Sequence, residues 1–107
     1  MKAADVLRAA ADKLIQDGWQ QGTYGPRPDR NVWNSPSGPN CIYGATLNAD
    51  SRWMASHVYD EAENALLAKV LPLGFDGLPA WNDAPERTAD EVIDLLLSVA
   101  ADLEGAP

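Results

Sequence analysis

The residues best suited to chemistry are one cysteine, one histidine and a polar pair further along the chain. Cys41 is predicted at the start of a helix, where the helix dipole favours the nucleophilic thiolate. His57 could act as the base for this thiol, and Asn82 or Asp83 could orient the imidazole. Such a set would support attack on an acyl carbon, as in a thiol-dependent hydrolase.

A structural interpretation of the same residues competes with this hypothesis. Their order resembles that of papain-like thiol hydrolases, but the local sequence that surrounds the cysteine in those enzymes is absent. Cys41 falls on the apolar side of its predicted helix, and cysteine is among the most frequently buried residues. His57 shares a helix face with Glu61 and Asn64, which is typical of a solvated surface. The thiol hydrolase therefore stands as an alternative, and we expect no complete catalytic set.

Metal, nucleotide and membrane chemistry find little support in the sequence. A structural zinc site needs about four Cys or His ligands, and the chain has one of each. The phosphate-binding patterns GxGxxG and GxxxxGK[ST] are both missing. No run approaches the roughly 18 apolar residues of a membrane span, and no signal peptide is apparent. We expect no cofactor, no metal and no membrane contact, and the single cysteine fits a reducing cytoplasm.

The elements that must position these residues are predicted to be helices. Apolar residues recur at helical spacing in three long segments, and a shorter segment carries the cysteine. The predicted segments are 3–17, from Arg52 or Ser56 to Leu71, and 88–104, with the short helix over 40–49. Two Gly- and Pro-rich segments, 20–40 and 72–87, are predicted to be long irregular loops. The sequence thus predicts an all-α fold, a small bundle in a single domain over 1–107.

The best local signals lie at the ends of these helices. Thr88 and Glu91 have the spacing of a capping box, in which each side chain bonds the other residue's backbone amide. Gly18 is placed to close the first helix in a left-handed conformation. Ile15 and Leu97 widen the apolar stripes of the first and last helices. A stripe as wide as that of the last helix implies contact with at least two other elements.

Charge is distributed unevenly along the chain. Residues 1–59 hold five acids and six bases, a net charge of +1. Residues 60–107 hold eleven acids and two bases, a net charge of −9. The two parts together give the net charge of −8. A field of this sign repels nucleic acids and anionic membranes but is compatible with a basic protein partner. An acidic mimic of nucleic acid is a weaker alternative, because the last helix also carries a wide apolar stripe.

Aromatic and basic residues favour a protein-binding role. Four tryptophans and three tyrosines are many for a chain of 107 residues, and a core of this size is not expected to bury them all. Tyrosine, tryptophan and arginine dominate the energetics of protein interfaces. The candidate binding residues are Tyr24, Arg27, Arg30, Trp33, Asn82 and Asp83. For Asn82 and Asp83, bonds that fix a loop are the simpler interpretation. Self-association as a homodimer is a further alternative, since a wide apolar stripe can pair with a second copy.

Three sequence motifs resemble a family of short uncharacterised proteins from actinobacteria and their phages. They are DGWQQG, CIYGA and WNDAPERTADEV, and together they extend over about residues 5–103. The matching positions are Gly18, Trp19, Cys41, Gly44, Ala45, Trp81, Asn82, Asp83, Arg87, Thr88 and Glu91. The Pro-rich segment before the cysteine is longer than in the family. The resemblance implies a phage or actinobacterial origin and no activity.

Overall fold

The computed structural model describes residues 2–21, 41–42, 45–46 and 56–105. These residues are mostly helical and form no strand, which confirms the predicted all-α class. The elements are α1 (Ala3–Asp17), α3 (Ser56–Val70), the 3-10 helix η1 (Leu71–Leu73), α4 (Leu78–Asn82) and α5 (Ala89–Gly105). Residues 42, 45 and 46, within the predicted short helix, are also helical. The predicted loop 20–40 lies outside the described residues from position 22 onward.

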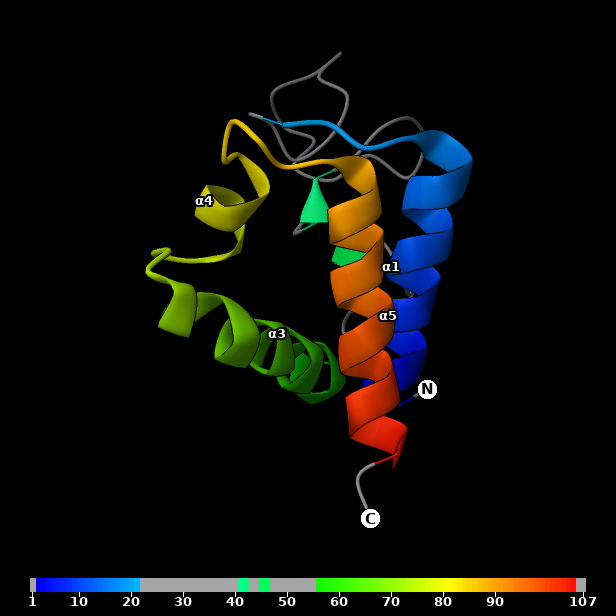
Figure 1. Ribbon diagram of the computed structural model, residues 1–107. Coiled ribbons are helices and arrows are strands. Elements are labelled where there is room, and N and C mark those ends of the chain that lie inside the picture. The colour runs from blue at the N-terminus through cyan, green and yellow to red at the C-terminus, as the bar shows by residue number, and fades with distance from the viewer. Residues whose placement is uncertain (1, 22–40, 43–44, 47–55, 106–107) are drawn as a thin grey trace.

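Helices α1 and α5 form the most extensive helix pair. They lie side by side and antiparallel, and α3 crosses them at a steep angle (Figure 1). An ion pair between Arg8 and Glu104 joins the beginning of α1 to the end of α5. The hydrogen bond from Arg8 lowers the pKa of the Glu104 carboxyl group. This pairing shows which turns of the two helices lie opposite each other.

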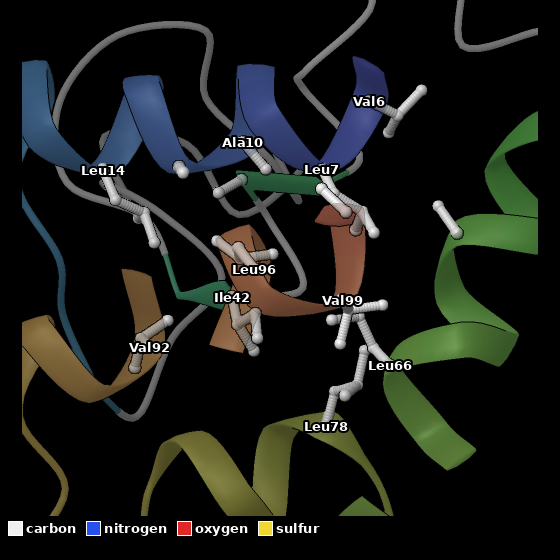
Figure 2. Close-up of a cluster of buried hydrophobic side chains, with 14 of the residues drawn as sticks. Val6, Leu7, Ala10, Leu14, Ile42, Leu66, Leu78, Val92, Leu96 and Val99 are labelled. Atoms are coloured by element: carbon white, nitrogen blue, oxygen red, sulfur yellow. The ribbon is translucent and has the colours of Figure 1, made fainter. Parts of the chain in front are cut away.

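One apolar core joins all the helices. Leu7, Ile42, Leu66 and Leu96 come from four different segments, and none of them is accessible to solvent. Figure 2 shows Ile42 beside Leu96, with the side chain of Leu66 directed toward α5. Helix α5 therefore contacts several elements along its buried stripe, as its width predicted.

The beginning of α5 has the capping arrangement that the sequence predicted. The backbone N–H of Thr88 donates to Glu91 Oε1 at 2.9 Å, and the N–H of Glu91 donates to Thr88 Oγ1 at 3.3 Å. At the end of α1, Gly18 has a φ of +95° and donates its N–H to Leu14 O at 3.0 Å. Its ψ of 165° is not the predicted left-handed value, so the chain leaves α1 in an extended direction.

The connection over 72–87 is more ordered than the irregular loop predicted for it. It contains α4 and part of η1. Gly74 closes η1 in the left-handed conformation, with φ +99° and ψ 7°. Pro79 lies in the first turn of α4, where a missing N–H has no intrahelical partner to lose. Proline in a Gly-rich segment predicts irregular structure, whereas at this position it favours the start of a helix.

Glu63 on α3 is a partly buried carboxyl group whose ionisation should affect the stability of the fold. Its partial burial, together with the neighbouring charge of Asp60, raises the pKa of Glu63 above its ordinary value. The folded state therefore holds this proton more tightly than the unfolded state, and ionisation weakens the fold as pH rises through the folded-state pKa. We expect Glu63→Gln to raise Tm at pH 7, and this gain to vanish below pH ~4, where the ordinary glutamate is also protonated.

The matched control is Glu61→Gln, which removes the same charge from an exposed position on α3. Thermal unfolding followed by circular dichroism at pH 7 and pH 3.5 would measure both variants. Equal changes in Tm for the two variants at pH 7 would show that net charge, rather than the burial of Glu63, sets the effect.

Candidate functional site

The polar centre of the molecule is the side chain of Asn82, which is 0% exposed. Its Oδ1 accepts hydrogen bonds from Trp19 Nε1 at 2.6 Å and from the backbone N–H of Ile42 at 3.0 Å. Its Nδ2 donates to Gln20 O at 3.1 Å and to Asp83 Oδ1 at 3.0 Å. A side-chain amide has two acceptor sites and two donors, so the capacity of Asn82 is fully used.

These bonds tie together three segments that are distant in the sequence. Asn82 ends α4, Trp19 and Gln20 follow α1, and Ile42 lies in a helical turn in which Ala45 N–H donates to Cys41 O at 2.9 Å. The amide oxygen of Asn82 thus caps this turn, satisfying an N–H that has no partner within the helix. Gln21 Nε2 adds bonds to the backbone oxygens of Asn82 and Ala84, at 3.0 and 2.8 Å.

A second cluster joins α4 to the start of α5. The Trp81 side chain is 5% exposed, and the Arg87 guanidinium lies 4.0 Å from the centre of its ring. Arg87 Nε donates to Trp81 O at 3.0 Å, and Nη1 donates to Glu91 Oε2 at 3.2 Å. The same guanidinium is 5.6 Å from the ring centre of Phe75. The WND and RT segments of the motif therefore lock the second connection onto α5.

Arginine at position 87 should be difficult to replace. Lysine keeps the charge but loses the planar group that stacks on Trp81 while its Nε–H reaches a carbonyl oxygen. We expect Arg87→Lys to lower the free energy of unfolding by about 1–2 kcal/mol. Urea denaturation followed by circular dichroism would measure this loss. The control is Arg8→Lys at an exposed ion pair, for which about 0.5 kcal/mol or less is expected. Equal losses in the two variants would contradict a special role for Arg87.

The geometry does not assemble the thiol-hydrolase set among the described residues. Cys41 is 3% exposed, so its thiol is closed to a substrate in this conformation. Asn82, the candidate for orienting an imidazole, would have to break the bonds that cap Ile42 and hold Trp19. The side chain of His57 lies outside the described residues. In the described part of the chain, no group of three or more His, Cys, Asp or Glu side chains is arranged to hold a metal ion.

The predicted binding residues fall into two groups. Tyr24, Arg27, Arg30 and Trp33 lie outside the described residues. Asn82 is in the interior and bonds distant segments in addition to its neighbour, and Asp83 is exposed and accepts a hydrogen bond from it. Both tryptophans that the structure describes also have structural contacts: Trp81 is buried, and Trp19 is half-buried.

The large apolar side chains exposed in the described residues are aliphatic rather than aromatic. They are Ile15, Leu71, Leu73, Leu97 and Leu103, with exposures of 36–66%. In the sequence, Ile15 and Leu97 lie at the edges of apolar stripes, and this position predicts that they widen the buried faces. Helical periodicity could identify these edges but not which of them a neighbouring helix covers.

These clusters lie in an all-helical fold, and the buried side chain of Asn82 has a structural role. The chain belongs to a family of unknown function, DUF6197, whose family model matches residues 1–102. Searches of curated proteins and of solved structures gave no match. Among the described residues, none of the helices has the length and apolar character needed to span a bilayer.

Proposed function

We propose that the protein is a non-enzymatic module that binds another protein through aliphatic side chains on its surface. The observation that carries this proposal is the set of five large aliphatic residues left exposed outside a closed core. Single exposed apolar residues are common, but groups of them mark interaction sites. Leu71 and Leu73 lie two residues apart in η1, and Ile15 and Leu97 lie on the neighbouring helices α1 and α5.

The arrangement of acids on α5 supports a protein binder over a nucleic-acid mimic. This helix carries five acids, which are Asp90, Glu91, Asp94, Asp102 and Glu104. Three of the five are in ion pairs, Glu91 with Arg87, Asp102 with Lys69, and Glu104 with Arg8. A mimic would have to present its acids unpaired, in place of phosphates. The paired acids instead stabilise contacts within the domain, and the surplus negative charge favours a basic partner.

The proposal includes the setting that the sequence resemblance implies. In this setting the module is encoded by a phage of an actinobacterium, or by the bacterium itself, and binds a host protein in the cytoplasm. The single cysteine is consistent with a reducing compartment. The sequence-derived residues Tyr24, Arg27, Arg30 and Trp33 provide a second candidate surface.

Capture from host lysate with chemical cross-linking tests this function. We expect the tagged protein to retain one dominant partner, and Cys41→Ser to retain it equally. At least one surface variant, either Ile15→Ser with Leu97→Ser or Arg30→Ala with Trp33→Ala, should lose the partner while keeping its helical circular dichroism. Absence of any cross-linked partner, or loss of capture in Cys41→Ser alone, would overturn the binding function and favour thiol chemistry.

A further inference from the structure

The exposed residues Ile15 and Leu97 lie opposite each other along the α1–α5 pair. The ion pair between Arg8 and Glu104 shows the register of these antiparallel helices. Ile15 is seven residues after Arg8, and Leu97 is seven residues before Glu104. Seven residues are two helical turns and change the direction of a side chain by only about 20°. Both side chains therefore lie at the same height, on the side of the pair that carries the ion pair.

A third aliphatic residue extends this surface. Ile93 is four residues before Leu97, which places it on the same side of α5 one turn away. Ile15 is 62% exposed and Leu97 is 42% exposed, whereas Ile93 is partly buried against the core. We call Ile15, Ile93 and Leu97 the aliphatic seam. On the other side of α5, Asp102 pairs with Lys69 of α3 at 3.2 Å, so the seam faces away from α3.

Acidic residues border the aliphatic seam on both helices. Asp12 is three residues before Ile15, and Asp90 and Asp94 are on the exposed side of α5. None of these three carboxylates forms an ion pair with a described residue. Arg8, the base on this side of the pair, is already engaged by Glu104 and lies 3.8 Å from Asp5. Within the described part of the chain, the surface is therefore an apolar strip whose acidic border is not neutralised by ion pairs.

We propose that the aliphatic seam binds a basic amphipathic helix of a partner protein, with leucine-like residues on the seam and Lys or Arg beside Asp12, Asp90 and Asp94. This mode buries apolar surface on both sides and gives the carboxylates their missing partners. The inference rests on the proposed protein-binding function and specifies the class of partner.

The negative charge of the border favours a cationic helix over the other partners that could cover an apolar strip. A symmetric dimer across the seam would place two acidic borders, each with Asp12, Asp90 and Asp94, around one interface, and like charges repel. Nucleic acids and anionic membranes carry charge of the same sign as this border and are repelled. A cationic helix is the occupant that satisfies both the apolar strip and its charges.

The test uses synthetic 18-residue helical peptides and the full chain. The probe contains Leu at helical spacing i, i+3, i+4 and i+7 with Lys elsewhere, and the control peptide has Glu in place of Lys. Fluorescence anisotropy in 0.1 M salt measures binding. We expect the wild type to bind the Leu/Lys helix and not the Leu/Glu helix. The double variant Ile15→Ser with Leu97→Ser should raise the Kd for the Leu/Lys helix at least tenfold. The triple variant Asp12→Asn with Asp90→Asn and Asp94→Asn should also weaken binding, and it should reduce the salt dependence of the Kd.

The matched control is Leu71→Ser with Leu73→Ser, which removes two equally exposed leucines away from the seam and should leave Kd unchanged. All the changed positions are exposed, and circular dichroism verifies that each variant is folded. Equal binding of the Leu/Glu helix would overturn the charge argument, and an equal loss in the control would overturn the site. If the Leu/Lys helix does not bind but the lysate experiment still yields a cross-linked partner, the seam is not the binding site, while the protein-binding function stands.

Discussion

Replacing Asn82 by alanine is expected to lower the free energy of unfolding by about 3–4 kcal/mol. The variant leaves the indole N–H of Trp19, the backbone N–H of Ile42 and the carbonyl of Gln20 without their present partner. Each buried polar group left unpaired loses about 1–3 kcal/mol, less where water can reach it, as at the half-buried Trp19. The expected loss is a large part of the roughly 5–15 kcal/mol that stabilises a small domain.

Two further substitutions distinguish hydrogen bonding from the volume of the side chain. Asn82→Asp keeps the size and the Oδ1 acceptor but places oxygen where Nδ2 now donates to Gln20 O and Asp83 Oδ1. It should be as destabilising as alanine at pH 7. Asn64→Ala changes an exposed asparagine of α3 and should alter stability by about 0.5 kcal/mol or less. Urea denaturation at 10 °C would compare the free energies of unfolding of Asn82→Ala, Asn82→Asp and Asn64→Ala. An Asn82→Asp variant as stable as wild type would show that the hydrogen bonds donated by Asn82 have no net effect on stability.

The long helices could be predicted from the sequence because their signals are local. The spacing of apolar residues depends only on the helix period, and the capping box is contained within Thr88–Glu91. For α1 the predicted range 3–17 is the observed Ala3–Asp17. The sequence does not predict the short helix α4, because a proline two residues after a glycine, here Pro79 after Gly77, is equally typical of a turn.

The role of Asn82 could not be predicted, because its partners lie far away in the sequence. Trp19 and Ile42 are 63 and 40 residues from it, and only the tertiary fold brings the residues after α1 and the turn at Ile42 to the end of α4. Sequence reasoning considered bonds to nearby backbone, which is the usual behaviour of an asparagine in a turn. The bond that Asn82 donates to its neighbour Asp83 goes to the side-chain oxygen Oδ1 and not to the backbone.

The exposure of the aliphatic seam could not be predicted for a related reason. Ile15 and Leu97 both lie at the edge of an apolar stripe, and a single helix gives no information on which edge a neighbour covers. The edge of α5 that faces α3 carries Leu95, which is partly buried, whereas the edge with Leu97 remains open. Only the register of α1 against α5 shows that the two open edges meet.

The adjacent residues Leu96 and Leu97 should separate stability from binding. Leu96 is 0% exposed in the core, and truncating it to alanine leaves a cavity, so we expect a loss of about 3–4 kcal/mol in the free energy of unfolding. Leu97 is 42% exposed, and alanine is the better helix former, so Leu97→Ala should change stability by about 0.5 kcal/mol or less. Urea denaturation would measure both variants.

The affinity for the Leu/Lys helix should fall more in Leu97→Ala than in Leu96→Ala, which is the reverse of the order for stability. Measured at 10 °C on the folded fraction, Leu96→Ala should keep the affinity of the wild type, because the truncated side chain does not reach the surface. Leu97→Ala should lose several-fold in affinity, because it removes apolar contact area from the seam. Successive residues of an α-helix point about 100° apart, so neighbouring leucines can serve the core and a partner separately. A stable Leu97→Ala protein with unchanged affinity would place binding elsewhere on the surface, whatever the result at Leu96.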